Sequence, residues 1–402
     1  MSETPTPPAP QPLRGLRVVE FTHMVMGPTC AMVLADLGAE VIKVEPIDGE
    51  GTRRLLGAGA GFFPMFNRNK LSIGIDLKQT DGAEVARRLA TSADVVVENF
   101  KAGVLAKFGL DYASLAARNE RLIYVSHKGF LPGPYEHRTA LDEVVQMMGG
   151  LAYMTGRPGD PLRAGTSVND IMGGLFGAIG TLGALIQRGI TGKGMEVQSA
   201  LFENNVFLMG QHMLQFAMTG KHPSPMPARD NPWAVYDVFT VKDGEQIFLA
   251  AVSDAQWRTL CDVLGFADLK QDPQLATNND RVRLRPQLLA TLRERLAGRS
   301  ASELAGLFEQ AGLPFAPIRR PEDLYDDPHL QATGGLADVV LPDGDKAGQT
   351  VKTTLLPFML DGRRLPVRLQ PPRLGAHTHE LLAGLGYSGD DIETLRERAI
   401  VA

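Results

Sequence analysis

The sequence predicts an α/β fold with a Rossmann-like parallel sheet and a second, smaller α+β domain. Short runs rich in β-branched residues alternate with segments of helical spacing through the first half of the chain. A stretch rich in proline, glycine and polar residues at 220–231 is followed by a second series of strands and helices. The length of 402 residues is also large for a single hydrophobic core. Strands that alternate with helices favour a parallel sheet, and the second series favours a separate domain.

The elements of the first half follow from the spacing of apolar residues. Residues 16–21 form a short β-branched run, which is typical of a strand. Residues 27–38 carry apolar side chains at helical spacing, and residues 40–45 alternate as a strand does. The same criteria predict helices at 80–92, 140–151, 169–188 and 200–219, and strands at 94–97, 122–126 and 196–199.

The two ends and the second half complete the expected organisation. Residues 1–12 are expected to be a disordered tail, because they are rich in proline and polar residues and lack the basic-then-apolar pattern of a signal peptide. We expect a linker at 220–232 and a small domain at 233–330. Further elements are predicted as a strand at 246–252, helices at 254–264, 281–296 and 302–311, turn-rich strands to about 368, and helices over 374–402.

Charge and composition exclude several classes of partner. The net charge of −5 argues against nucleic acid or an anionic membrane as the main partner. We find no run that is long and apolar enough to span a bilayer, so a cytoplasmic protein is expected. The two cysteines have no zinc spacing, and His377-Thr378-His379-Glu380 lacks the histidine pair of metalloproteases. No metal site is therefore expected.

One segment carries the strongest candidate for chemistry, Ser167-Val168-Asn169-Asp170-Ile171-Met172-Gly173-Gly174. Asn169 can cap a helix, and Asp170 would then lie in the first turn, where the helix dipole favours the ionised carboxylate. Such a carboxylate could act as a covalent nucleophile, or it could be an ordinary first-turn acid. Gly173 and Gly174 have two interpretations. Their small size allows a ligand to approach while their backbone N–H groups support an oxyanion, or it allows another helix to pack tightly.

Several ordered motifs accompany this segment along the chain. They are Leu13–His23 with Gly27-Pro28, Leu34–Pro46, Asn67-Arg68-Asn69-Lys70, Asp76-Leu77-Lys78, Asp94–Phe100 and Thr191-Gly192-Lys193-Gly194. Together they resemble the class III CoA-transferases, which include formyl-CoA transferase, carnitine CoA-transferase and the 2-methylacyl-CoA racemases. The resemblance implies a large domain built from residues 13–219 and from 331–402, the latter as return linker and C-terminal part. It also implies an inserted small domain and a homodimer of interlocked rings.

The resemblance assigns a role to Asp170 as the nucleophile. Its carboxylate would attack an acyl-CoA, giving a mixed anhydride and then an aspartyl-CoA thioester, from which a free acid takes up CoA. Coenzyme A is then a substrate, and no metal or redox cofactor is required. Succinyl-CoA is a common donor in the family, so a dicarboxylic acid or its sulfur analogue is the expected partner acid.

The same resemblance suggests which residues bind CoA. Pro46 and Thr139 stand where formyl-CoA transferase has an arginine and a lysine, so the phosphate contacts differ in detail. Arg68, His127 or Arg229 could meet a second carboxylate, since the glycine run of oxalate-specific enzymes is absent near 230–236. The CoA-binding candidates are His23, Val25, Met26, Ile75, Lys78, Asn99, Phe100, Lys107 and Arg138.

Asp142 is a candidate for orienting the substrate, or it is structural. The racemases have a histidine directly before this aspartate, as one of two acid–base groups, and here that position is Leu141. The alternative of a racemase or isomerase is therefore disfavoured. A non-catalytic CoA-binding protein is the third alternative, which the intact surroundings of Asp170 disfavour.

Overall fold

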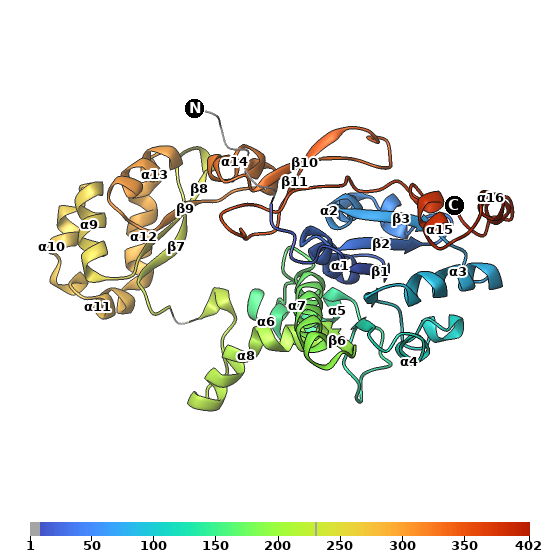
Figure 1. Cartoon of the computed structure of the whole chain (residues 1–402). Coiled ribbons are helices and arrows are strands. Elements are labelled where there is room, and N and C mark those ends of the chain that lie inside the picture. The colour runs from blue at the N-terminus through green and yellow to red at the C-terminus, as the bar shows by residue number, and fades with distance from the viewer. Residues whose placement is uncertain (1–8, 230) are drawn as a thin grey trace. The chain divides into compact units, whose positions relative to one another are not determined.

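The computed structural model describes residues 9–229 and 231–402 (Figure 1). The chain forms two compact units. One takes in the chain up to Pro227 and again from Pro328 to Ala402, and the other is Ala228–Asp327. The candidate site lies in the first unit. The predicted tail falls mostly outside the described residues, which leave out 1–8.

A six-stranded parallel sheet forms the centre of the first unit. Its strand order is β3-β2-β1-β4-β5-β6, so the order reverses between β1 and β4, as in doubly wound dinucleotide-binding folds. The predicted α/β class with a parallel sheet is confirmed. The strands are β1 (Arg17–Phe21), β2 (Glu40–Glu45), β3 (Lys70–Gly74), β4 (Val95–Glu98), β5 (Ile123–Lys128) and β6 (Glu196–Ala200).

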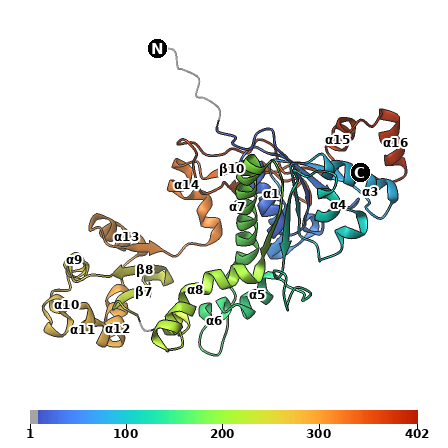
Figure 2. The ribbon, with the colours of Figure 1, turned by 60° about the horizontal axis from the view of Figure 1, so that its bottom comes forward.

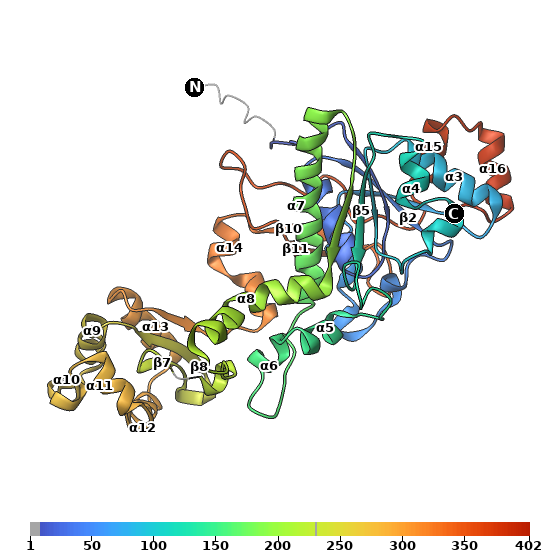
Figure 3. The same cartoon turned by 90° about the horizontal axis from the view of Figure 1, so that it is seen from below.

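Both faces of this sheet are covered, because successive side chains of the strands enter two different cores. Val18 and Val41 face the core made with α1 (Met26–Asp36) and α7 (Val168–Thr191). Val19 and Ile42 face the core made with α3 (Thr80–Thr91), α15 (Thr378–Gly384) and α16 (Gly389–Glu397). Figures 2 and 3 show α1 beside α7 on one face and α15 and α16 near α3 on the other.

The C-terminal segment returns to the β3 edge of the sheet. The backbone N–H of Asn69 donates to Leu369, and that of Ala402 donates to Gly74. The hairpin of β10 and β11 precedes this return. The remaining elements of this unit are α2 (Phe62–Phe66), α4 (Tyr112–Ala116), α5 (Asp142–Met148), α6 (Leu151–Thr155), α8 (Leu201–Thr219), α14 (Pro328–Ala332), β10 (Leu336–Val340) and β11 (Thr350–Thr354).

The second unit has its own antiparallel sheet, in the order β7-β8-β9, and its own core around Trp257 and Phe308. Its elements are β7 (Val235–Thr240), β8 (Gln246–Ala251), α9 (Asp254–Leu264), α10 (Ala267–Gln271), α11 (Asn278–Arg283), α12 (Arg285–Leu296), α13 (Ala301–Gln310) and β9 (Phe315–Pro317). Across both units, short 3₁₀ helices lie at 51–54, 57–59, 105–108, 226–228, 242–244, 273–275 and 321–326.

Two predicted helical segments differ from the structure, and three strands lie outside the predicted elements. The helix predicted at 281–296 is two helices, because Pro286 falls in the first turn of α12 and cannot continue α11. The helical region at 140–151 is divided into α5 and α6 at Gly149 and Gly150, the latter with a φ of 91°. The strands β3, β7 and β9 were not predicted.

The expectation that no segment could span a membrane needs correction. Helix α7 is long and apolar enough to do so by length and composition, with a mean hydropathy of 1.3. In the structure, however, its glycine-rich face packs on α1, and 39% of the apolar window is buried inside the first unit. Length and composition alone therefore do not make it a membrane span.

Candidate active site

A cavity of about 370 Å³ opens where the parallel strands end. His23 follows β1, Asn99 and Phe100 follow β4, and His127 lies on β5. In open parallel sheets, ligands bind at the carboxyl ends of the strands where the strand order reverses. The sheet thus places the cavity at this reversal, and Asp170 at the start of α7 also lines it. The residues of the predicted site that line this cavity are His23, Met26, Asn99, Phe100, Arg138, Asp142 and Asp170.

The start of α7 is fixed by a carboxylate from another helix. Asp142, the first residue of α5, accepts the backbone N–H of Asn169 at 2.8 Å and that of Asp170 at 3.2 Å. These are N–H groups that a helix leaves without an internal partner. Asp142 is held in turn by the side-chain amide of Gln146, whose oxygen accepts the N–H of Ala164 at 2.8 Å.

The predicted capping role of Asn169 is wrong. The helix begins one residue earlier, at Val168, with Ser167 as the flanking residue. Asn169 therefore lies inside the first turn and is fully buried. The carboxylate of Asp142 supplies the acceptor that a capping side chain would have supplied.

The charge state of Asp170 also differs from the prediction. Burial, followed by the neighbouring carboxylate of Asp142, raises the pKa of Asp170 to about 7, against a smaller lowering by Arg163. The helix N-terminus was expected to favour the ionised form, but its N–H groups are already bonded to Asp142. Near neutral pH, Asp170 is therefore divided between the carboxylate and the protonated acid.

Gly173 and Gly174 lie against α1. A Cβ added at Gly173 would lie 2.2 Å from the methyl carbon of Met26, and one at Gly174 would lie 2.5 Å from the Cβ of Thr29. Both residues come after the first turn, where N–H groups bond within the helix. The geometry favours their role in close packing, and an oxyanion role stays a prediction.

The loop between β1 and α1 is held at the cavity by Asn99. The side chain of Asn99 accepts the N–H of His23 at 3.0 Å and donates to its carbonyl at 2.7 Å. The rings of His23 and Phe100 pack edge to face. Met26 lines the cavity, whereas the side chain of Val25 is buried in the core.

The other CoA-binding candidates lie around a second cavity, of about 640 Å³. Ile75 and Lys78 line it, and Phe100 borders both cavities. Lys107 is exposed on the 3₁₀ helix at 105–108. Leu105 of the same helix lines this second cavity. The two cavities therefore share a wall at Phe100. The first cavity lies beside Asp170, and the second lies beside Lys78.

The residues that depart from the expected pattern lie in these same walls. Pro46 lines the second cavity, while Thr139 and Leu141 line the first. The side chain of Leu141 is 62% exposed. The position at which the racemases have a catalytic histidine thus presents a side chain without acid–base chemistry. Arg138 lies at the same cavity with its guanidinium over the ring of Tyr135, 4.0 Å from the ring centre.

Of the three residues predicted to meet a second carboxylate, one lines the cavity. Arg68 is buried in an ion pair with Asp36, and Arg229 belongs to the other unit. His127 lines the cavity, but burial lowers its pKa to about 3, so it is a neutral side chain. Sequence reasoning missed Lys101 and His137, which line the cavity from loops after β4 and β5.

His377 has a structural partner, since its Nδ1 accepts the backbone N–H of Ser72 at 3.1 Å. In the part of the chain that the structure describes, no three histidine, cysteine or acidic side chains are grouped as metal ligands would be.

Known proteins are similar to this chain along most of its length. Residues 13–378 match the family described as CoA-transferase family III. An acyl-CoA transferase from Fusarium pseudograminearum is 35% identical, with 97% of this chain and 88% of that protein covered. A succinate–glutarate CoA-transferase from Agrobacterium fabrum is 33% identical, with 95% and 98% covered.

A solved structure has the same fold along the chain. It is a CaiB/BaiF family protein from Brucella suis, 36% identical, with a TM-score of 0.85 over 94% of this chain and all of that chain. The family match over residues 13–378 includes the six strands of the sheet and the start of α7. The chain belongs to CoA-transferase family III.

Proposed function

We propose that this enzyme transfers CoA from an acyl-CoA to a free carboxylic acid, with Asp170 as the covalent nucleophile. The observation that carries the proposal is the position of Asp170. Its carboxyl group lines the cavity at the carboxyl edge of the sheet, on a helix start that Asp142 holds in place. Orientation of a nucleophile by fixed hydrogen bonds is what covalent catalysis requires.

The reaction needs no external electron donor or acceptor. A carboxylate oxygen of Asp170 attacks the thioester carbon, the C–S bond breaks, and CoA leaves as the thiolate. The thiolate then attacks the carbonyl carbon of Asp170, and the C–O bond of the anhydride breaks to release the donor acid as its carboxylate. The acceptor carboxylate runs the same two steps in reverse, and the carboxylate of Asp170 is regenerated. CoA is a substrate throughout.

The two cavities support this assignment of the substrate. We place the reacting thioester beside Asp170, and the nucleotide end of CoA near Ile75 and Lys78, with Phe100 between them. His23 and Asn99 shape the passage. Lys107 and Arg138 supply positive charge near its two ends, since both side chains are exposed.

We further propose succinyl-CoA as a donor and a dicarboxylic acid as acceptor. The relative from Agrobacterium fabrum is named for succinate and glutarate. In this chain Lys101, His137 and Arg138 lie along the same cavity as Asp170. The positive charges of Lys101 and Arg138 at this place favour an acid that carries a second carboxylate.

We also propose a homodimer. Helices α7 and α8 leave apolar side chains exposed in one chain, among them Ile179, Ile190, Phe207, Leu214 and Met218. A surface of this kind is typical of an interface between subunits. The interlocked form, like a cytoplasmic location, stays a prediction.

The direct test is mass spectrometry of the intact protein and its peptides after incubation with succinyl-CoA. We expect an adduct of the mass of CoA on the peptide that contains Asp170, and its discharge by glutarate. Asp170→Ala should form no adduct and should keep its fold by circular dichroism. Turnover of Asp170→Ala at the normal rate would contradict the mechanism. Incorporation of deuterium at the α-carbon of an acyl-CoA, without transfer, would instead support the racemase alternative.

A further inference from the structure

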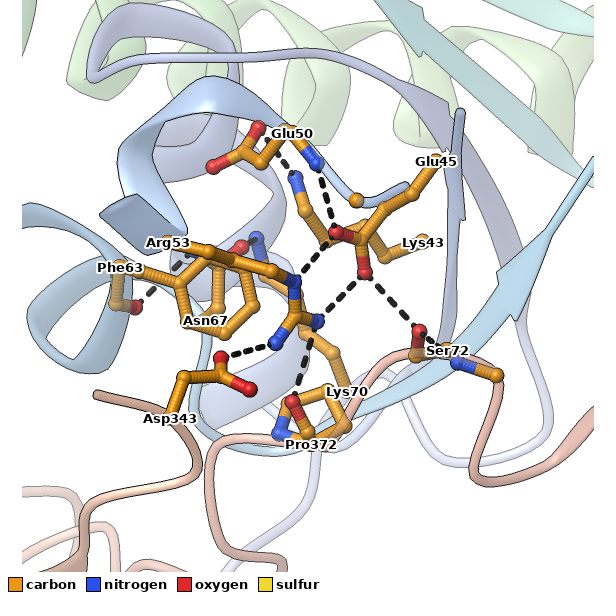
Figure 4. A network of polar contacts seen from close by, with 12 residues as sticks. Lys43, Glu45, Glu50, Arg53, Phe63, Asn67, Lys70, Ser72, Asp343 and Pro372 are labelled. Atoms are coloured by element: carbon orange, nitrogen blue, oxygen red, sulfur yellow. Dashed lines mark hydrogen bonds and ion pairs between the residues drawn. The ribbon is translucent and has the colours of Figure 1, made fainter. Parts of the chain in front are cut away.

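A group of fully buried charges lies directly behind the loop that joins β1 to α1. Glu20 of β1, Lys43 of β2 and Lys70 of β3 stand on neighbouring strands, and all three are 0% exposed. The Nζ of Lys70 lies 2.8 Å from a carboxylate oxygen of Glu20, and the Nζ of Lys43 lies 3.7 Å from the same oxygen. The shared carboxylate thus joins the two ammonium groups (Figure 4 shows both lysines and their surroundings).

Each ammonium group also donates to the backbone beside the loop, Lys43 at the start of the loop and Lys70 in the first turn of α1, which follows it. Lys43 donates to the carbonyl of Thr22 at 3.2 Å, and Lys70 donates to the carbonyl of Pro28 at 3.1 Å. The hydroxyl of Thr22 in turn donates to Glu20 at 2.7 Å. The segment between these two carbonyls contains His23 and Met26, which line the cavity beside Asp170.

The loop has a conformation that needs such support. Met24 has a φ of 65°, in the left-handed region that side chains other than glycine rarely adopt. Conformations of this kind persist where the surrounding structure fixes the chain on both sides. Here Asn99 holds His23 from β4, and the two lysines hold Thr22 and Pro28 from beneath.

A second layer of contacts connects these charges to the C-terminal segment. Glu50 pairs with Lys43 at 3.1 Å and donates its backbone N–H to Glu45. Arg53 binds Glu45 with two nitrogens at 2.7 Å, pairs with Asp343, and donates to the carbonyl of Pro372. Figure 4 shows Arg53 between Glu45 and Asp343.

Stability alone does not account for two buried ammonium groups. Burial penalises both charged forms. It lowers the pKa of Lys70 to about 8 even with Glu20 beside it, whereas for Lys43 the carboxylates of Glu20, Glu50 and Glu45 outweigh burial and raise the pKa. Apolar side chains of similar size often replace buried ion pairs without loss of stability. What an apolar side chain could not do is donate hydrogen bonds to Thr22 and Pro28.

We propose that Lys43 and Lys70, joined by Glu20, are positioning residues that hold the β1–α1 loop in the shape that receives the CoA thioester. The inference rests on the proposed function, because that function assigns the loop to CoA. The lysines touch neither substrate nor Asp170. They act through the backbone of the loop, so their loss weakens thioester binding more than it slows the attack by Asp170.

The test compares Lys43→Met and Lys70→Met with Arg188→Met in the full-length protein. Arg188 is also a buried cation in an ion pair, with Asp94, but it lies at the other end of α7 from Asp170. Three quantities are measured: the Kd of free CoA by calorimetry, KM and kcat with succinyl-CoA, and hydrogen exchange of residues 22–29. Thr22→Val serves as a milder variant that keeps both lysines and removes only the hydrogen bond to Glu20.

We expect a Kd and KM about tenfold higher in each lysine variant, with faster exchange of the loop and with kcat within about threefold of wild type. Thr22→Val should shift in the same direction by less, and Arg188→Met should leave Kd and exchange unchanged. A lysine variant that fails to fold leaves Thr22→Val to decide. Unchanged Kd and loop exchange in the folded variants would overturn the proposal. Failure of the wild type to form the Asp170 adduct would instead count against the proposed function, whatever the variants do.

Discussion

Asp142 and Asp170 face the same cavity, and their hydrogen bonds give them different tasks. Asp142 accepts two backbone N–H groups and a side-chain amide, so its carboxylate is committed to the start of α7. In the part of the chain that the structure describes, no hydrogen-bond donor to the carboxylate of Asp170 is found, and Arg163 offsets only a small part of the effect of burial on its pKa. One acid therefore fixes geometry, and the other is left with its oxygens available for attack.

The pH dependence of adduct formation follows from this arrangement. Only the carboxylate of Asp170 attacks, and burial followed by Asp142 raises its pKa to about 7. The rate of adduct formation with limiting succinyl-CoA should therefore rise with pH, with a midpoint near 7, and level off above it. Asp142→Asn keeps an oxygen for the two N–H groups but removes the charge, so the midpoint should move to lower pH.

Rapid quenching followed by mass spectrometry of the CoA adduct on the Asp170 peptide, across pH 5–9, measures this midpoint. Glu136→Gln is the matched control, because it removes a carboxylate from the same cavity without being among the groups that act on Asp170. A midpoint that stays in place in Asp142→Asn, or a rate independent of pH, would refute the assigned coupling.

The sequence motif identified Asp170, but the local pattern of residues assigned the helix cap to Asn169 in place of Asp142. A local pattern places a polar side chain at a helix start, and Asn169 satisfies that pattern. The acceptor is Asp142, which lies 27 residues earlier and reaches Asn169 only when α5 packs against α7. Contacts of this kind are set by packing and leave no local signal.

The glycines of α7 matter as a surface that lets two helices approach. Gly173, Gly174 and Gly177 have no room for a Cβ, since Met26, Thr29 and His127 occupy those places. This contact holds the start of α7, and with it Asp170, against the loop that carries Met26. The cost in helix propensity, about 1 kcal/mol for each glycine, is offset by packing.

Two glycines of this one helix provide a matched test of that packing. At Gly174 an added Cβ would lie 2.5 Å from the Cβ of Thr29 and 2.6 Å from the carbonyl oxygen of Met26, whereas at Gly189 nothing lies within 4 Å. We expect Gly174→Ala to lower the free energy of unfolding by about 1–3 kcal/mol. Gly189→Ala should raise it by about 0.5–1 kcal/mol, through helix propensity alone.

Urea unfolding measures both variants, and adduct formation shows whether the displaced helix start also slows the reaction in Gly174→Ala. If the two alanines changed stability by equal amounts, close packing at Gly174 would not be its role.

Among the strands of the parallel sheet, those with β-branched residues were predicted well and β3 was not. Apolar runs identify buried parallel strands, and β1 and β4 have them. β3 carries Lys70 and Ser72, which are buried because Glu20 and Glu45 face them across the sheet. A strand whose polar side chains find partners on neighbouring strands has no apolar pattern to reveal it.

The first unit is completed by residues far apart in the chain. The side chain of Asn69 donates to the carbonyl of Pro366 and accepts the N–H groups of Arg368 and Leu369. Arg53 reaches Asp343 and Pro372 in the same way. These contacts span about 300 residues. The family resemblance implied that both ends of the chain belong to one domain, while the particular contacts between them required the structure.

The exposed apolar side chains of α7 and α8 predict that the whole molecule is a dimer. On α8, Phe207 is 70% exposed and Leu214 is 66% exposed, and on α7 Ile186 is 70% exposed. Covering them with a second copy of the chain would remove this surface from water, at about 25 cal/mol for each Å² of apolar area. We therefore expect twice the mass of one chain by light scattering.

Leu214→Glu should shift this mass toward that of one chain, because an ionised carboxylate at a buried interface lacks a partner. Leu56→Glu is the control, since Leu56 is 89% exposed and lies on neither helix. Activity measured in the same samples then shows whether one subunit can carry out transfer, because Asp170 and both cavities belong to a single chain. A wild-type mass of one chain would contradict the dimer. A mass that Leu214→Glu leaves unchanged and Leu56→Glu alters would place the interface elsewhere on the chain.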